Sequence, residues 1–170
     1  MLGDHYLWRK SLPYEGAARI PLLIRAPERF GVKSGGVIDK PVCLEDIMPT
    51  FLELADVPVP DGVDGRSLMP LLRGESPSWR ETLHMECAPN FQALTDGRWK
   101  YAWFVEDGAE RLFDLENDPA ECRDLSGDAK HHDTLVDFRQ RLIKQLEHRP
   151  EGFSDGEKLV SGVAYPSRFH

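Results

Sequence analysis

The first part of the chain shows short apolar runs separated by Pro and Gly. Residues 20–25, Ile-Pro-Leu-Leu-Ile-Arg, form an apolar run of strand length, which predicts a buried strand in a parallel sheet. Pro27 and the pair Gly35-Gly36 end this run and mark a surface loop. Residues 37–42 form a second short candidate strand. This region is therefore expected to belong to a mixed α/β fold.

A helical pattern follows at residues 46–55. Asp46 can act as the N-cap, and Pro49 is tolerated in the first turn because the amides there have no intrahelical acceptor. We expect this helix to pack on a core through one apolar face, which consists of Ile47, Phe51, Leu54 and Ala55. Residues 67–72 predict a short helical turn that Gly74 closes.

After the Ser76-Pro77-Ser78 cluster the pattern changes to strands in series. Asp96-Gly97 and Asp107-Gly108 stand between apolar runs and are hairpin signals, so a four-stranded antiparallel meander is expected. Its strand-like runs are residues 82–87, 91–95, 99–105 and 111–115. Alternation in the third run places two sets of side chains on opposite faces: Trp99, Tyr101 and Trp103 on one, and Lys100, Ala102 and Phe104 on the other.

A long helix is expected to pack on this sheet, from Asp133 or Thr134 to His148. Its apolar residues recur at helical spacing: Leu135, Phe138, Leu142, Ile143 and Leu146. Residues 151–170 predict an extended tail that lies back over the domain or is partly disordered. The pattern thus divides the chain into an α/β part at residues 1–76, a sheet-and-helix part at 77–150, and the tail.

Composition narrows the range of functions. The formal net charge of -8 over 170 residues argues against a nucleic-acid binder, because affinity for a phosphate backbone needs a basic face. No apolar run approaches the ~20 residues that span a bilayer, so no membrane partner is expected. The three cysteines are far apart, which indicates neither a zinc site nor a disulfide framework. An anionic substrate stays open, since a site can be locally positive within an acidic protein.

Residues 3–16 form a polar loop that carries the candidate chemistry. Lys10 stands between Trp8 and Tyr14 in the sequence, a setting that could fix an ammonium against an oxyanion. The alternative is a surface loop whose Lys is merely solvated, because any short motif carries a false-positive risk. The residues alone leave both open.

The same loop resembles a segment of the sulfatase family, in the alkaline phosphatase superfamily, that reads Gly-Asp/Glu-His-x-Leu-Trp-x-Lys-x-x-x-Tyr-Glu. Four further stretches resemble the family's in the same order, and four ordered blocks are specific where one would be weak. They are residues 46–50, Asp-Ile-Met-Pro-Thr; residues 64–72, Asp-Gly-Arg-Ser-Leu-Met-Pro-Leu-Leu; and the late strands at residues 94–101 and 110–121. The resemblance implies the C-terminal part of an alkaline-phosphatase-like sulfatase fold of the α/β class, ending in the four-stranded antiparallel sheet and its long C-terminal helix.

The resemblance also implies chemistry that this chain supplies only in part. Sulfatases use a formylglycine made within Cys/Ser-x-Pro-Ser/Ala-x-Arg, and they bind calcium through carboxylates and amides. Cys87-Ala88-Pro89 is rejected as that signature because Asn90 and Gln92 stand at its Ser/Ala and Arg positions. Residues 1–5 coincide with the end of the family string Ser-Asp-His-Gly-Asp-Met-Leu-Gly-Asp-His. The chain is therefore expected to start inside a sulfatase, directly after the metal ligands, and to hold no metal ligand itself.

Five residues are the candidates for the site. By resemblance, Lys10 is expected to contact the sulfate oxygens and to stabilise negative charge on the transferred group. His5 is expected either to orient or reach the site or to be a hydrogen-bonded loop His. His84, Glu86 and Asn90 are candidates for contacts to the non-sulfate part of the substrate, with structural roles as the alternative.

The function that follows from the resemblance is hydrolysis of sulfate esters, on a sulfated small molecule or a sulfated glycan. One alternative is a phosphonate or phosphate-ester hydrolase of the same superfamily. The other is a non-catalytic binding or assembly module. A parallel sheet that lacks its central strands would expose the apolar run at residues 20–24, so self-association through this edge is also predicted. The sequence makes no prediction of the compartment.

Overall fold

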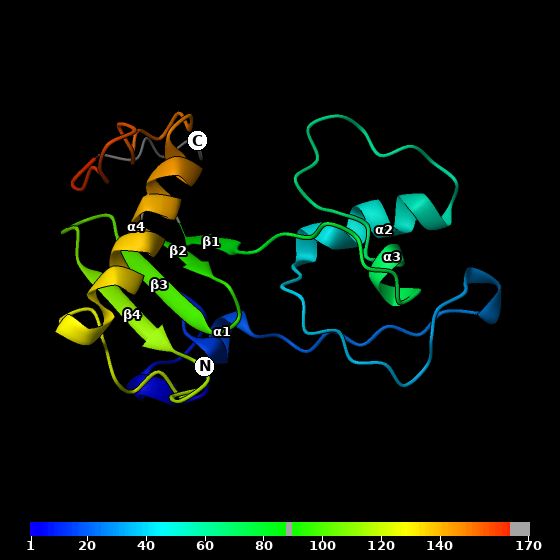
Figure 1. Ribbon diagram of the computed structural model, residues 1–170, viewed down its shortest axis with the longest axis horizontal. Helices are drawn as coiled ribbons and strands as arrows, with labels where there is room; N and C mark the ends of the chain where they lie inside the picture. Colours follow the sequence, from blue (N-terminus) through cyan, green and yellow to red (C-terminus); the bar gives the residue numbers. More distant parts are fainter. Residues whose placement is uncertain (88–89, 164–170) are drawn as a thin grey trace. The chain divides into compact units, whose positions relative to one another are not determined.

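The computed structural model describes residues 1–87 and 90–163, which fall into two compact units (Figure 1). The first unit combines Met1–Ile20 with the chain from His84 onward, and the second is Pro21–Leu83. Residues 1–20 thus pack with the sheet that begins after residue 82. The division into domains at residues 1–76, 77–150 and 151–170 stays a prediction.

The sheet of the first unit is the expected antiparallel meander. Its strands lie side by side in chain order: β1 (Leu83–Cys87), β2 (Phe91–Thr95), β3 (Trp99–Phe104) and β4 (Glu110–Asp114). Phe91 pairs with Phe104, and Tyr101 pairs with Leu112. Gly97 and Gly108 have φ angles of 95° and 74° in the turns, a conformation that favours Gly and that the Asp-Gly signal anticipated.

Helix α4 (His132–Leu146), entered through the 3₁₀ turn η4 (Ala129–His131), covers one face of the sheet (Figure 1). This confirms the predicted helix to within two residues. The predicted apolar stripe of α4 is buried and packs against side chains of β2, β3 and β4, among them Leu94, Tyr101, Trp103 and Leu112. Alternation along β3 therefore places its aromatic residues as expected.

The stretch after α4 folds back onto this core. Phe153 is buried in the cluster that α4 forms with the sheet, and Ser154 Oγ donates to the Ile143 carbonyl at 2.9 Å. A bridge between Ser154 and Leu159 closes the turn. Residues 153 and 154 thus contact the sheet-and-helix core, while the extended tail over residues 151–170 stays a prediction, since residues 164–170 lie outside the described part of the chain.

The N-terminal segment packs on the opposite face of the sheet. It contains the 3₁₀ turn η1 (Asp4–Tyr6) and the short helix α1 (Glu15–Ala18). Leu12 contacts the small apolar cluster of Phe91, Ala93 and Ala102, whose side chains alternate with those that face α4. The Tyr14 ring lies 5.8 Å from the Phe113 ring, centroid to centroid.

The second unit is built around the start of a helix. It contains η2 (Glu28–Phe30), η3 (Leu44–Asp46), α2 (Ile47–Leu54) and α3 (Met69–Leu72). The buried carboxylate of Asp46 accepts the amides of Cys43 and Arg66 at 2.9 and 2.8 Å. Thr50 Oγ1 donates to the Asp46 carbonyl and accepts the Leu68 amide. These bonds join two of the motifs, residues 46–50 and 64–72, into one structure.

Three sequence-based expectations for this unit are wrong. Residues 20–25 and 37–42 form no strand, because within the described residues no neighbouring strand offers them hydrogen bonds. The side chains of the first run are largely exposed, with Leu23 at 89%. The apolar face of α2 is not buried either, since Phe51 is 65% exposed and the helix buries Pro49 and Thr50 instead. Periodicity identified these apolar positions but not what covers them.

Candidate functional site

The loop that carries Lys10 is closed on itself by backbone contacts. Leu2 and Trp8 form an antiparallel bridge, and the Arg9 amide donates to the Met1 carbonyl at 3.2 Å. The Met1 nitrogen lies 3.0 Å from the Arg9 carbonyl and 3.0 Å from the Gly16 carbonyl. Met1 therefore links the residue before Lys10 to helix α1.

Three residues of this loop other than Gly adopt left-handed backbone conformations. The φ angles are 53° at His5, 60° at Tyr6 and 80° at Arg9. Each such residue costs on the order of 1–3 kcal/mol and persists where surrounding contacts impose it, often at functional sites. The conformation of the loop is thus set by its tethers, against the intrinsic preference of its residues.

Lys10 and His5, the two predicted catalytic residues, both lie in this loop. The Lys10 side chain is exposed, and within residues 1–87 and 90–163 it forms no ion pair. The His5 ring stacks on the Tyr14 ring at a centroid distance of 4.0 Å and an interplanar angle of 17°. Tyr14, Phe113 and His5 therefore connect the loop to β4 through aromatic contacts. The loop brings Lys10 and His5 into one tethered segment.

A buried ion cluster anchors the end of this loop to the sheet. Lys100 Nζ lies 2.7 Å from Glu15 Oε1 and 2.7 Å from Glu121 Oε1, and the Lys100 and Glu121 side chains are almost fully buried. The second oxygen of Glu121 accepts the Glu15 amide. A buried ammonium needs such carboxylate partners to offset its desolvation.

Sequence reasoning missed the buried ion cluster of Lys100 and Glu121, although both residues lie in quoted motif blocks. A signal was present. Lys100 alternates with Trp99 and Tyr101 in a strand that has no polar face, so a cation at that position needs a buried counter-charge. The sequence does not indicate which carboxylate meets it, since Glu15 is 85 residues away.

The three predicted substrate-contacting residues lie elsewhere. His84 Nε2 is 2.8 Å from Gln92 Oε1, and Glu86 pairs with Arg149 at 2.9 Å. Both contacts lie on the α4 side of the sheet, whereas the Lys10 loop packs on the other side. The Asn90 side chain is exposed at the turn between β1 and β2. The chain therefore does not gather these three residues around Lys10, and Ala88 and Pro89 of the rejected Cys87 motif lie outside the described residues.

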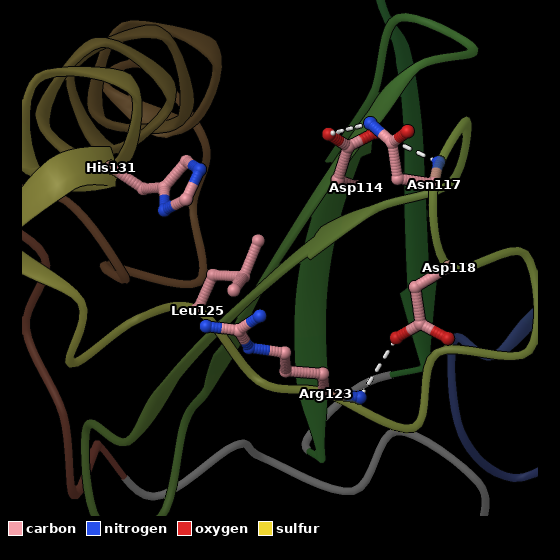
Figure 2. A pocket seen from close by; sticks show the side chains of 6 residues that line it. All are labelled: Asp114, Asn117, Asp118, Arg123, Leu125 and His131. Atoms are coloured by element: carbon pink, nitrogen blue, oxygen red, sulfur yellow. Dashed lines mark hydrogen bonds between the residues drawn. The ribbon is translucent and has the colours of Figure 1, made fainter.

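A pocket of about 240 Å³ lies at the turn after β4 (Figure 2). It is lined by Asp114, Asn117, Asp118, Arg123, Leu125 and His131. Its polar groups bond to one another: Asn117 Nδ2 donates to Asp114 at 2.8 Å, and the Arg123 amide donates to Asp118 at 2.8 Å (Figure 2). Although burial opposes it, the hydrogen bonds that Asp114 accepts from Asn117 and from the Glu116 amide lower the pKa of that carboxyl. We assign this pocket to the turn of the 110–121 motif, and it contains none of the five predicted site residues.

The described residues do not fit a metal site. They contain no group of three or more His, Cys, Asp or Glu side chains that could hold an ion. In the same part of the chain, no helix has the length and apolar character needed to cross a membrane. Any metal chemistry would therefore need ligands other than those described.

The family is decided by a match that covers most of the chain. The model described as "N-sulphoglucosamine sulphohydrolase, C-terminal" matches residues 3–148. The chain belongs to this sulfatase family. Arylsulfatase of Clostridium perfringens is 40% identical over 171 residues, which covers 98% of this chain and 35% of the relative. Choline-sulfatase of Rhizobium meliloti is 35% identical over 150 residues, which covers 82% of this chain and 28% of the relative.

Solved structures give the same fold. Phosphonate monoester hydrolase SpPMH from Silicibacter pomeroyi has a TM-score of 0.76 at 32% identity, over 85% of this chain and 32% of that chain. BT4656, solved in complex with D-glucosamine-2-N,6-O-disulfate, has a TM-score of 0.72 at 26% identity, over 86% of this chain and 32% of that chain. These likenesses confirm the predicted C-terminal part of a sulfatase fold. The chain spans about a third of the length of these proteins.

Proposed function

We propose that this chain is the C-terminal part of a sulfate-ester hydrolase and that it supplies the loop whose Lys10 contacts the sulfate group. The observation that carries the proposal is an exposed ammonium on a loop that is tethered at both ends and held in a strained backbone. Relatives named arylsulfatase and choline-sulfatase support it. A sulfated aryl, choline-like or amino-sugar ester is the substrate class, and a sulfated glycan is included.

The role of Lys10 follows from the charge of the reaction. When the bond between sulfur and the ester oxygen breaks, negative charge grows on the sulfuryl oxygens and on the leaving oxygen. An ammonium held in a fixed position stabilises that charge without reorganisation at the moment of reaction. The nucleophile would be supplied from outside the described residues.

The remaining predicted residues have graded support. His5 is five residues before Lys10, and its ring is stacked on the Tyr14 ring. We therefore propose that His5 positions the loop or approaches the same anion. His84, Glu86 and Asn90 stay predictions as contacts to the non-sulfate part of the substrate. The bonds of His84 and Glu86 within the chain favour their structural roles.

Calcium belongs to the proposal only as a cofactor bound elsewhere in a longer protein. The side chains of residues 1–87 and 90–163 do not form a site for it, and no role of Lys10 depends on it. Calcium would supply positive charge near the sulfate oxygens.

The test uses the reading frame that contains this chain, extended upstream. We expect an in-frame Cys/Ser-x-Pro-Ser/Ala-x-Arg motif there and hydrolysis of 4-nitrophenyl sulfate by the complete product. Lys10→Ala should lower kcat about 10²–10³-fold, as for the loss of one oxyanion donor. Lys144→Ala, an exposed Lys on α4, is the matched control and should leave the rate unchanged. Full activity of the Lys10 variant would overturn the assignment.

A second candidate function is hydrolysis of phosphonate or phosphate esters. The likeness to a phosphonate monoester hydrolase, at a TM-score of 0.76, favours it. The two functions separate when the complete product is assayed with an aryl sulfate and an aryl phosphonate at equal concentration. A larger kcat/KM for the phosphonate would make phosphonate hydrolysis the main function and sulfate-ester hydrolysis the second candidate.

Self-association of the isolated chain is a further part of the proposal. Apolar side chains of the second unit are exposed, among them Leu23, Val37 and Phe51. Large exposed apolar surfaces mark interaction sites. We expect light scattering to show oligomers that Leu23→Asp reduces. A monomeric wild-type chain would contradict self-association and would not discriminate between the two hydrolase functions. An unrelated sequence upstream of this chain would instead favour a non-catalytic assembly module.

A further inference from the structure

We propose that Lys100 and Glu121 are positioning residues for the Lys10 loop, acting on it through Glu15. The inference rests on the proposed function for its consequence in catalysis, but the mechanical link can be tested without it. Neither residue touches Lys10. They set where the loop lies on the sheet, and thereby where the ammonium is presented.

The cluster is well suited to hold a segment in place. Lys100 comes from the inner strand β3 and has no exposed side-chain surface, while the Glu121 side chain is 1% exposed. Both oxygens of Glu121 are used, one by Lys100 Nζ and one by the Glu15 amide. Charged partners at fixed positions are more directional than apolar contacts. Helix α1 is therefore held through its first residue by side chain and backbone together.

The charges of Lys100, Glu15 and Glu121 balance only in part. One ammonium faces two carboxylates, and Glu15 keeps 21% of its side chain exposed, which leaves the excess negative charge partly hydrated. Glu121 has a φ angle of 54°, a left-handed conformation that is costly for a residue other than Gly. Its amide donates to the Asp118 carbonyl at 3.0 Å, which helps to hold it there. The cluster therefore holds Glu121 in a costly backbone conformation, which an exposed surface ion pair would not require.

In the 170-residue chain, a continuous set of contacts connects this anchor to Lys10. Gly16, next to Glu15, offers its carbonyl to the Met1 nitrogen, and a Cβ on Gly16 would lie 3.3 Å from the Met1 side chain. Met1 in turn bonds the backbone of Arg9, the neighbour of Lys10. The Tyr14 ring, which lies between Lys10 and Glu15 in the sequence, stacks on the His5 ring. A shift of Glu15 must therefore move or loosen the loop.

The experiment compares variants of the 170-residue chain. Lys100→Met removes the ammonium, and Lys144→Met removes one from the exposed face of α4 as the matched control. The double variant Lys100→Met/Glu121→Met also removes the Glu121 carboxylate, which would otherwise be buried without its cation. The sheet can then fold with two apolar side chains in place of the ion pair. Each protein is measured by amide hydrogen exchange and by the NMR shifts of the His5 ring protons, which the Tyr14 ring displaces while the two rings are stacked.

We expect amides of Arg9, Glu15 and Ala18 to exchange about ten- to a hundredfold faster in Lys100→Met, and the His5 shifts to move to unstacked values. In the double variant, the amides of β2 and β3 should regain wild-type protection while the loop stays fast and unstacked. A purely structural role predicts that loop and sheet recover together, and that result would overturn the proposal. Wild-type exchange of the loop in any folded variant without Lys100 would overturn it too.

Assay of the complete product with 4-nitrophenyl sulfate separates this proposal from the function on which it draws. A loop that loosens in Lys100→Met, together with a loss of activity in Lys10→Ala of the complete product, supports both. A loop that loosens in Lys100→Met, together with full activity of Lys10→Ala in the complete product, supports the anchor and contradicts the sulfate contact of Lys10.

Discussion

Arg80 and Asp46 form a two-point ion pair inside the second unit. Arg80 Nη1 and Nη2 each lie 2.6 Å from one oxygen of the Asp46 carboxylate. Asp46 is completely buried, and Arg80 keeps 12% of its side chain exposed. Because Asp46 also accepts the amides of Cys43 and Arg66, this pair connects η3, the 64–72 motif and the chain that leads into β1.

Arg80→Met should therefore destabilise the second unit. It leaves the Asp46 carboxylate buried without its cation, and breaking such a pair costs about 3–5 kcal/mol. Urea denaturation followed by tryptophan fluorescence measures the loss, because the Trp79 ring lies 5.0 Å from the Arg80 guanidinium and reports on the second unit. Glu53→Ala is the control, because its pair with Arg73 is about one-third exposed and should contribute at most about 1 kcal/mol. Equal losses in the two variants would contradict the prediction.

The sheet unit should lose stability in acid through Glu110. Burial alone would raise the pKa of Glu110, but hydrogen bonds from Arg139 and Tyr101 outweigh it and hold the pKa below the ordinary 4.5. A carboxyl with a depressed pKa stabilises the fold above 4.5, and this contribution is lost as the pH falls through the lower, folded value. The difference in Tm between wild type and Glu110→Gln should be largest near neutral pH and should shrink below pH 4.5. A constant difference would show that the charge of Glu110 is not involved.

Gly65→Ala should disrupt the second unit at one close contact. A Cβ at this position would lie 2.0 Å from the Glu45 carbonyl oxygen, so the backbone must move to admit it. Overpacking of this kind costs about 1–3 kcal/mol or more. Thermal unfolding of Gly65→Ala and Gly36→Ala provides the comparison. The nearest atom to a Cβ on Gly36 is 4.0 Å away, and this variant should keep the wild-type Tm.

Phe153→Ala tests whether the stretch after α4 belongs to the core. Phe153 is 1% exposed and its ring lies 6.1 Å from that of Trp103. Removing a buried Phe side chain costs about 3–5 kcal/mol. The free energy of unfolding in urea should fall by that amount, and Leu159→Ala, at a partly buried site, should cost less. A negligible effect at Phe153 would mean that the core forms without this segment.

Local signals predicted the sheet unit well. The Asp-Gly turns fix the hairpins, and a strand that alternates Trp99, Tyr101 and Trp103 with smaller or charged residues has only one face that suits a helix. Leu135 to Leu146 then supply that helix at the right spacing. These elements are neighbours in sequence, so local pattern and tertiary packing agree.

Contacts between distant segments could not be predicted. The run at residues 20–25 is apolar enough for a strand, but a strand exists only if another one pairs with it, and composition does not record the pairing. The site was limited in the same way. Resemblance predicted Lys10 as a sulfate contact, whereas the ion cluster at the end of its loop depends on the meeting of Glu15 with Lys100 and Glu121, which are 85 and 106 residues away.

That separation has a consequence for how the protein is made. Helix α1 leaves the ribosome long before β3, and at about 5–20 residues per second the 85 intervening residues take roughly 4–17 s to synthesise. During this interval, Glu15 lacks its buried partner Lys100 and can pair only with the exposed Arg19, 4.0 Å away at the end of the same helix. A nascent chain arrested before residue 100 should therefore leave its first twenty residues sensitive to protease, and resistance should develop only once Glu121 has emerged.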